Sequence, residues 1–259
     1  EAYDAVPRSH PAFVSAELGR AQALSKIGKI EMGIEVLAQL AESFPNLRQV
    51  HATLGEFLRQ DGQYERAIVS YDIAIDMIDH SMPEHWYVHY VRGTAHDRLG
   101  DWELGLRDFD RALSLSPNQF QVLNYVGYSL VERGERLEEA LSMIERAVVA
   151  QPKAGYILDS LGWVQFRLGY YEGAIVHMER AVELMATDPV VNNHLGDVYW
   201  AVGRKTEARF QWLRALSFVT EATRSEDINL IRMHRKLDIG LDAVLAEEGA
   251  PPLKMVDGN

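Results

Sequence analysis

A glycine that returns at nearly constant spacing is the feature of this 259-residue chain that most constrains its fold. The intervals are 34, 38, 34, 35 and 34 residues, in the series Gly28, Gly62, Gly100, Gly134, Gly169 and Gly203. A fixed period of this length is typical of stacked supersecondary units, each of which buries its apolar face against its neighbours. The spacing therefore predicts a repeat array and argues against a single globular core.

The residues around each glycine indicate what the repeated unit is. Between Tyr156 and Leu184, a Leu-Gly pair ends seven residues before Gly169, and alanines follow that glycine by five and twelve residues. Small residues at these points allow two helices to cross closely, and a glycine suits the turn between them. The same frame recurs around the other five glycines, most weakly around Gly28. Each unit is therefore expected to be a helix, a turn and a second helix.

This pattern of Leu-Gly, Tyr, Ala, Phe and Pro at a period of about 34 residues resembles the tetratricopeptide repeat. The resemblance implies an all-α fold, a right-handed superhelical solenoid of helix-turn-helix repeats. Pentatricopeptide repeats, which bind RNA, are the nearest confusable class, but the acidic charge and the Leu-Gly and Ala signature count against them. Six units are expected within residues 14–222, at 14–47, 48–81, 82–119, 120–154, 155–188 and 189–222.

The N-terminal segment and the longest interval depart from this frame. Tyr3, Val6 and Pro11 have the offsets that close the third unit, so residues 1–13 are expected to be the end of a truncated upstream repeat. The longest interval contains the capping-box sequence Ser-Met-Pro-Glu at residues 81–84, which predicts that the next helix begins one turn early.

The C-terminal segment lacks the repeat pattern. A second capping-box sequence, Thr-Arg-Ser-Glu, occupies residues 223–226, and apolar residues then follow at helical spacing. We expect a C-terminal capping helix over residues 223–248, with a break at Gly240. Residues 249–259 contain Ala-Pro-Pro and are expected to be a loose tail.

Composition excludes several kinds of site. The formal net charge of −12 argues against a nucleic-acid backbone or an anionic membrane surface as the main partner. The chain has no cysteine, so disulfides, zinc-thiolate sites, cysteine-ligated clusters and a cysteine nucleophile are excluded. It also lacks the sequence motifs of nucleotide-binding loops, zinc proteases and serine hydrolases, and it has no apolar run of the roughly 18 residues that a membrane span needs.

Three histidines raise the question of a metal site. His85, His89 and His96 fall near one helical face. His89 and His96, like His51, occupy positions that the repeat fills with core aromatics, and zinc usually requires three or four convergent ligands. The sequence therefore favours core packing, and we expect no metal, no cofactor and no catalytic residues.

The resemblance implies that the first helices of successive units line a concave groove. On each first helix, a stripe at spacings of three, four and three residues faces away from the core; in the second unit it holds Gln49, Ala52, Glu56 and Arg59. Aromatic side chains beside amides and acids on these stripes suit a peptide-holding surface. The alternative is that the rings pack against the first helix of the next unit. The expected peptide-binding residues are Tyr87, Tyr90, Asn124, Tyr128, Tyr156, Asp159, Trp163, Phe166, Asn193, Asp197 and Trp200.

The sequence thus predicts a non-enzymatic scaffold or adaptor for protein–protein interaction, which binds an extended peptide or a partner protein in its concave groove. The alternative is a regulatory or targeting domain of a larger enzyme. A receptor for the acidic tails of heat-shock chaperones is disfavoured, because only Asn124 fits among the candidate clamp positions Ala52, Glu56, Tyr90, Thr94 and Asn124.

The expected partner is a protein or a peptide, with no nucleic acid and no membrane span. Self-association through the truncated N-terminal end is left open. The last two repeats resemble bacterial multi-repeat proteins, some of them lipoprotein adaptors, and this favours the bacterial envelope or periplasm, with the cytoplasm as the alternative.

Overall fold

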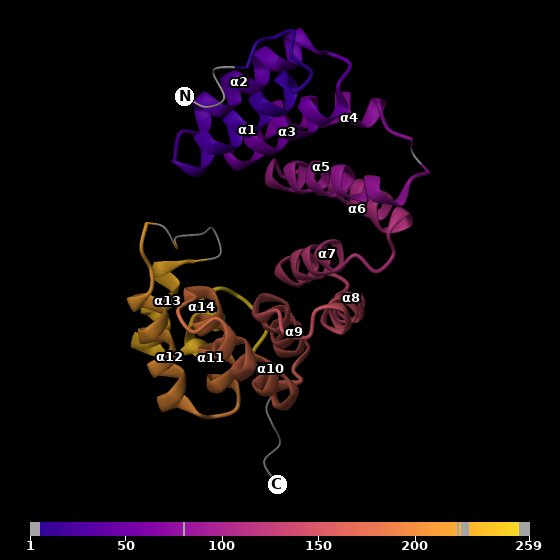
Figure 1. The fold of residues 1–259 in the computed structure, drawn as a ribbon. Helices are drawn as coiled ribbons and strands as arrows, with labels where there is room; N and C mark the ends of the chain where they lie inside the picture. The colour runs from indigo at the N-terminus through magenta and orange to yellow at the C-terminus, as the bar shows by residue number, and fades with distance from the viewer. Residues whose placement is uncertain (1–5, 80, 222, 224–227, 254–259) are drawn as a thin grey trace. The chain divides into compact units, whose positions relative to one another are not determined.

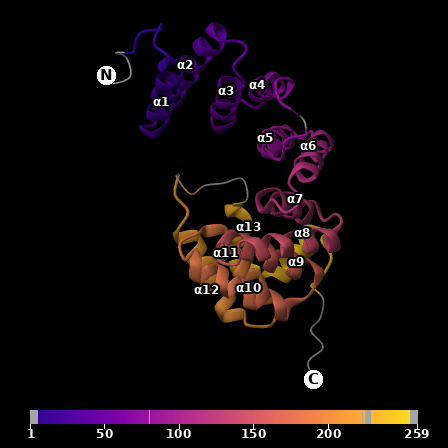
Figure 2. The same ribbon diagram turned by 45° about the vertical axis from the view of Figure 1, so that its right-hand side comes forward.

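The computed structural model describes residues 6–79, 81–221, 223 and 228–253. Over this part of the chain there are 14 α-helices, one short 3-10 helix and no strand, and successive helices pair as antiparallel hairpins (Figures 1 and 2). The chain divides into two compact units, unit 1 (Glu1–Pro117) and unit 2 (Asn118–Asn259). The predicted all-α fold of helix-turn-helix repeats is confirmed.

Unit 1 consists of three helical hairpins. Its elements are α1 (Phe13–Lys26), α2 (Ile30–Ser43), α3 (Arg48–Gln60), α4 (Tyr64–Asp76), the 3-10 helix η1 (Pro83–His85), α5 (Trp86–Arg98) and α6 (Trp102–Leu115).

Unit 2 consists of three more hairpins and two shorter C-terminal helices. Its elements are α7 (Phe120–Arg133), α8 (Leu137–Ala150), α9 (Gly155–Leu168), α10 (Tyr171–Leu184), α11 (Pro189–Ala201), α12 (Lys205–Ser217), α13 (Leu230–Ile239) and α14 (Leu241–Glu247). No helix in the described ranges is both long and apolar enough to cross a membrane.

The six recurring glycines all lie in the turns between paired helices. Their φ angles are 75°, 76°, 86°, 68°, 83° and 83° in chain order, a left-handed conformation that other residues adopt only with strain. The turn after Gly134 contains one extra residue, and there Arg136 also takes a positive φ of 47°. Arg136 is held by two hydrogen bonds to Glu139, at 2.8 and 2.6 Å.

The glycines inside the first helices allow the helices of each hairpin to approach closely. A Cβ atom added at Gly55 would lie 2.6 Å from the ring of Tyr71, and one added at Gly162 would lie 2.6 Å from Met178. Ala174, on the facing helix of the latter pair, is fully buried. The predicted close crossing of the two helices is therefore confirmed.

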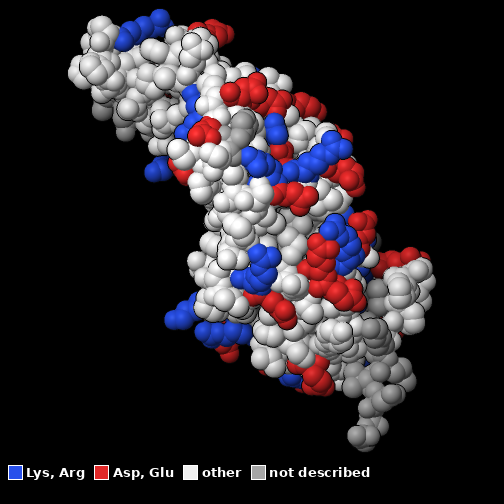
Figure 3. All heavy atoms as spheres, turned by 90° about the vertical axis from the view of Figure 1, so that its right-hand side faces the viewer, with Lys and Arg blue, Asp and Glu red and all other residues white. Residues whose placement is uncertain are grey.

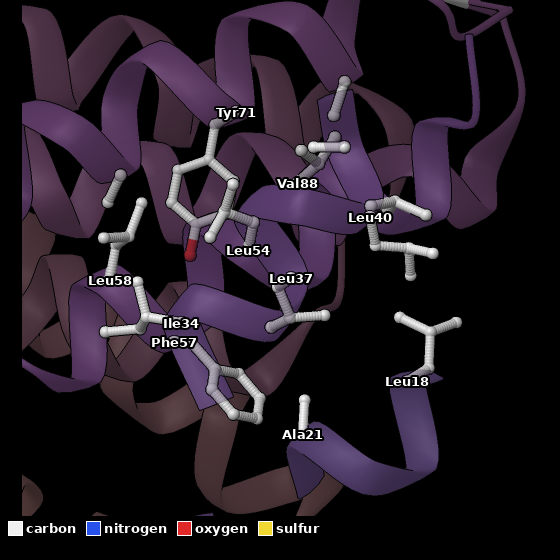
Figure 4. Close-up of a cluster of buried hydrophobic side chains, with 14 of the residues drawn as sticks. Leu18, Ala21, Ile34, Leu37, Leu40, Leu54, Phe57, Leu58, Tyr71 and Val88 are labelled. Atoms are coloured by element: carbon white, nitrogen blue, oxygen red, sulfur yellow. The ribbon is translucent and has the colours of Figure 1, made fainter. Parts of the chain in front are cut away.

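The core of unit 1 lies between successive helices. Figure 4 shows Leu37 of α2, Leu54 and Phe57 of α3 and Tyr71 of α4 among a continuous set of buried side chains. Leu37 is 0% exposed and Tyr71 is 1% exposed. This cluster joins neighbouring hairpins, as expected for an array whose units bury their apolar faces against one another.

Two of the three histidines assigned to the core are buried. His51 contacts the carbonyl oxygen of Pro45 through Nε2 at 2.9 Å, and Nδ1 of His89 lies 3.4 Å from the carboxylate of Asp108. His96 is only half-buried.

The predicted capping box at residues 81–84 is wrong. The Ser81 hydroxyl donates to Asp79 Oδ1 at 2.7 Å, and Met82, at the start of η1, makes no side-chain capping bond. An early helical turn is present as η1, with Pro83 as its first residue, because proline needs no backbone donor there.

At the C-terminus, α13 begins after Asn229, whose side chain accepts a hydrogen bond from the Arg232 backbone at 2.9 Å. Gly240, with a φ of 87°, separates α13 from α14. Most of the capping box predicted at residues 223–226 lies outside the described residues, as does Tyr3. The assignment of residues 1–13 to an upstream repeat stays a prediction.

Candidate functional site

The aromatic residues predicted on α9 are buried between helices. Trp163 and Phe166 are each 8% exposed, and their rings stack with centroids 4.9 Å apart. On its other side Trp163 stacks on His194 of α11 at 4.1 Å, and its indole Nε1 donates to Glu132 of α7 at 2.6 Å. Trp163 thus joins three first helices, and these rings pack against neighbouring units instead of lining an open surface.

Asp159 is also engaged inside unit 2. Both its carboxylate oxygens lie 3.1 Å from Nδ1 of His194, and both side chains are buried. Burial alone would lower the pKa of His194, but the charge and hydrogen bond of Asp159 raise it above its ordinary value. The pair therefore joins α9 to α11, and it is an ion pair when His194 is protonated.

Two predicted site residues on α11 are covered by α13. Lys236 donates from Nζ to Asn193 Oδ1 at 2.8 Å and to the two oxygens of Asp197 at 2.6 and 2.8 Å. Lys236 is 0% exposed and Asp197 is 1% exposed. Burial lowers the pKa of Lys236, while the carboxylate of Asp197 opposes that shift. The polar stripe that suggested a peptide site is occupied by a lysine of this chain.

Trp200, the third predicted residue on α11, is also covered, by α14 and by the break before it. Its indole nitrogen donates to Asp242 of α14 at 2.8 Å, and the ammonium of Lys205 lies 3.9 Å from its ring centroid. The added-Cβ position of Gly240 would lie 2.3 Å from this ring, so the break between α13 and α14 rests directly on the indole.

The remaining predicted residues of unit 2 are more accessible. Tyr156 is 45% exposed, and partial burial raises the pKa of its hydroxyl. Asn124 and Tyr128 of α7 are half-buried. Their assignment to a binding surface stays a prediction.

In unit 1, the predicted residues Tyr87 and Tyr90 form an aromatic cluster at the start of α5. Tyr87 is 48% exposed and its ring lies 5.4 Å from that of Trp86 and 6.2 Å from that of Tyr90. Tyr90 is half-buried and its ring lies 6.2 Å from that of Phe109 in the core. The cluster is anchored by Tyr90 and presents Tyr87 to solvent.

Tyr87 borders a surface pocket of about 620 Å³, here termed the α3 pocket. Its walls come from α1, α3 and α5, which are the first helices of three successive hairpins. The lining residues are Gln22, Ser25, Lys26, Arg48, Gln49, Ala52, Thr53, Glu56, Phe57, Gln60 and Tyr87. Apart from Tyr87, the expected peptide-binding residues do not line it. Gln49, Ala52 and Glu56 lie on the outward stripe of the second unit, but this stripe has no aromatic residue, which is the signal that favours α9 in the sequence.

Glu56 is the acidic residue of the α3 pocket, and its carboxylate is engaged. It accepts hydrogen bonds from Arg59 at 2.7 and 3.1 Å, from Gln60 at 2.7 Å and from the Tyr71 hydroxyl at 3.2 Å. Burial raises the pKa of Tyr71 and of Tyr87, and the negative charge of Glu56 adds to both shifts. The charge of Glu56 is therefore largely compensated by its neighbours.

Within the described ranges, no group of three or more His, Asp and Glu side chains is placed to hold a metal ion. On the face drawn in Figure 3, basic and acidic side chains lie side by side and do not separate into a basic area.

Comparisons with known proteins identify tetratricopeptide repeats in part of the chain. The tetratricopeptide repeat family model matches residues 54–120 and 90–154. A TPR repeat-containing protein of Pseudomonas aeruginosa is 28% identical over 186 residues, which cover 71% of this chain and 31% of the relative. The chain thus spans about a third of the length of that relative.

Solved structures show the same fold at low sequence identity. A tetratricopeptide repeat protein from Parabacteroides merdae has a TM-score of 0.68 at 16% identity, covering 91% of this chain and 90% of its own. The Cut9–Hcn1 hetero-tetramer gives a TM-score of 0.76 at 16% identity, covering 93% of this chain and 45% of the matched chain. PilF of Pseudomonas aeruginosa gives 0.60 at 20% identity, covering 78% and 88%.

Proteins of this fold are generally non-catalytic repeat scaffolds for protein interaction. Four observations indicate tetratricopeptide repeats: the left-handed turn glycines, the close-packed helical hairpins, the family match and the structural neighbours. Residues 54–154 match the tetratricopeptide repeat family model, and the described residues have the fold of solved tetratricopeptide repeat proteins.

Proposed function

We propose that this scaffold holds an extended peptide segment of a partner protein in the α3 pocket of unit 1. The observation that carries the proposal is the pocket itself, about 620 Å³ in volume and walled by three successive first helices. Such a surface supplies apolar contacts, amides and an exposed aromatic ring together, which is the usual composition of a peptide-binding site.

The length of the α3 pocket suits a short extended peptide. Its lining includes both ends of α3, from Arg48 to Gln60. The axial rise over this helix is about 18 Å, at about 1.5 Å per residue. An extended chain advances about 3.3 Å per residue, so roughly five or six peptide residues would lie along it.

The side chains between these ends suit peptide contact. Ala52 offers apolar surface, and Tyr87 offers an exposed ring at the wall formed by α5. Gln22 and Gln49 are exposed amides that can donate to and accept from a peptide backbone. The corresponding residues of α9 and α11 are engaged within unit 2, so the proposal centres on unit 1.

The proposal is tested with a photo-crosslinking residue and a random peptide library displayed on phage. We expect selected peptides to crosslink to p-benzoyl-phenylalanine placed at Thr53 in the pocket, and not at Val69, which is 60% exposed on α4. Tyr87→Ala is expected to weaken these peptides about 5- to 30-fold, the usual loss for truncating an aromatic anchor.

Tyr170→Ala is the matched control, because Tyr170 is 55% exposed and lies outside the α3 pocket. Its affinity for the selected peptides should equal that of the unmodified chain. Peptides that crosslink equally at both positions, or that bind the Tyr87→Ala variant without loss, would refute the pocket as the binding site.

A further inference from the structure

We propose that the α3 pocket selects acidic peptides, with Lys26 and Arg48 as its anion-binding residues. This inference rests on the proposed function, because it names the class of peptide that the same pocket takes. It is carried by the distribution of charge around the pocket.

Lys26 and Arg48 are unpaired cations on the pocket wall. Both are exposed, and neither forms an ion pair with any residue in the described ranges. Arg92 of unit 1, by contrast, binds Asp72 and Asp108 at 2.7 and 2.6 Å. Lys26 and Arg48 line the same pocket, so this pocket carries two uncompensated positive charges in a chain with a formal net charge of −12.

Glu56 does not cancel this positive charge. Its carboxylate already binds the guanidinium of Arg59 at 2.7 Å, the amide of Gln60 at 2.7 Å and the hydroxyl of Tyr71 at 3.2 Å. A basic ligand would have to compete with Arg59 for it. The charge that remains available to a ligand therefore comes from Lys26 and Arg48, and it is positive.

The two cations lie toward opposite ends of the pocket. A Cβ atom added at Gly33 of α2 would lie 3.2 Å from the carbonyl oxygen of Ala21 and 2.8 Å from the ring of Phe57, so these two residues mark one level on α1 and α3. The two helices run in the same direction, because each is antiparallel to α2. Lys26 lies five residues beyond this level and Arg48 nine residues before it.

This placement sets the spacing of the acidic groups that a peptide should carry. The axial separation of the two cations is about 20 Å, from about 1.5 Å per residue on each helix. The long side chains of Lys and Arg reach inward over part of that distance. An extended peptide at about 3.3 Å per residue would then present its two carboxylates roughly five positions apart.

The surface between the cations is uncharged apart from the engaged Glu56. It offers Ala52 and the exposed ring of Tyr87 for an apolar side chain, and the exposed amide of Gln49 for the peptide backbone. The ligand that fits this sequence of groups is an extended peptide with an acidic residue, an apolar residue and a second acidic residue.

The test uses three labelled peptides of about ten residues in fluorescence anisotropy titrations of the full chain. One carries two Asp residues roughly five positions apart around a central Leu, and the other two carry Asn or Lys at the Asp positions. The Asp peptide should bind at least about five-fold tighter than the Asn peptide in about 50 mM salt, and this advantage should shrink in about 300 mM salt.

Charge removal and charge reversal at the two cations then test the assignment. Lys26→Gln with Arg48→Gln should reduce the affinity for the Asp peptide about 5- to 10-fold, to the level of the Asn peptide. Lys26→Glu with Arg48→Glu should favour the Lys peptide. The matched control is Lys29→Gln with Arg107→Gln, which changes the net charge equally at exposed positions outside the pocket and should have no such effect. Unchanged helical circular dichroism shows that each variant is folded.

Equal binding of the Asp and Asn peptides, or tighter binding of the Lys peptide, would overturn the acidic selectivity. If these peptides still crosslink at Thr53, only the charge inference fails and the peptide-binding pocket stands. If none of the three peptides binds and no library peptide crosslinks at Thr53, both the inference and the proposed function fail.

Discussion

The buried pair of His194 and Asp159 should make the stability of unit 2 depend on pH. Burial acts to lower the pKa of His194, but Asp159 outweighs burial and raises it above 6.5, and Glu132 and Asp197 act in the same direction as Asp159. A group whose pKa is raised by folding contributes stability that is fully present below the unfolded pKa and lost as pH rises through the folded pKa. This contribution should therefore decline as the pH rises above about 6.5.

The measurement is urea unfolding of the unmodified chain and of His194→Gln at about pH 5.5 and 8.5. The difference in unfolding free energy between the two proteins should be larger at the lower pH, because only the unmodified chain gains the protonated pair. A difference that is the same at both pH values would show that His194 does not hold a raised pKa in the folded state.

Single residues also show where the sequence was sufficient and where it was not. The register correctly placed Gly28 and its five counterparts in turns and His89 in the core. It also assigned Tyr87 of α5 and Trp163 of α9 to the outward-facing stripes of their helices, but Tyr87 is 48% exposed and Trp163 is 8% exposed. Helical spacing determines which face a side chain lies on, and it does not determine whether the next helix covers that face.

At the level of the helical hairpin, a glycine in the first helix should set how closely the second helix can pack. A Cβ atom at Gly196 would lie 2.4 Å from the ring of Trp212, which is fully buried and donates its indole hydrogen to Asp197 at 2.8 Å. The ring cannot move without breaking that bond or shifting α12. Gly196→Ala is therefore expected to lower the unfolding free energy by about 1–3 kcal/mol, the usual cost of overpacking a core.

The control for this prediction is a glycine of the turn. Gly28 has open space around its added-Cβ position and a φ of 75°, so Gly28→Asn should cost little, because asparagine tolerates this conformation. Chemical denaturation midpoints compare the two variants. If Gly196→Ala were as stable as the unmodified chain, the close approach of α11 and α12 would not depend on that glycine.

The C-terminal helices show what a pattern of polar residues leaves undecided. Asn193 and Asp197 were predicted to contact a partner because polar residues on such a stripe are typical of a binding surface. In the structure their partner is Lys236 of α13, 39 residues beyond Asp197 in the sequence. A buried lysine on a short amphipathic helix carries no local sequence signal that identifies its acceptor, so the sequence predicted the helix and not its contact.

For the whole chain, a repeat array predicts that damage to one unit spreads only to its neighbours. In unit 2, polar contacts link α7 to α9 through Glu132 and Trp163, α9 to α11 through Asp159 and His194, and α11 to α13 through Asp197 and Lys236. Lys236→Met should leave the carboxylate of Asp197 buried without its main counter-charge, at a cost of about 3–5 kcal/mol. Hydrogen exchange should then accelerate in α11 to α14.

The same experiment tests how far the damage spreads. α1 to α4 belong to unit 1 and Lys236 belongs to unit 2, so the amide protection of these helices should be unchanged in Lys236→Met. The intervening helices should show a graded effect, because each contributes only nearest-neighbour contacts to the next. Equal loss of protection in α2 and α11 would mean that the chain unfolds as one cooperative body, and the additive account of its repeats would have to be abandoned.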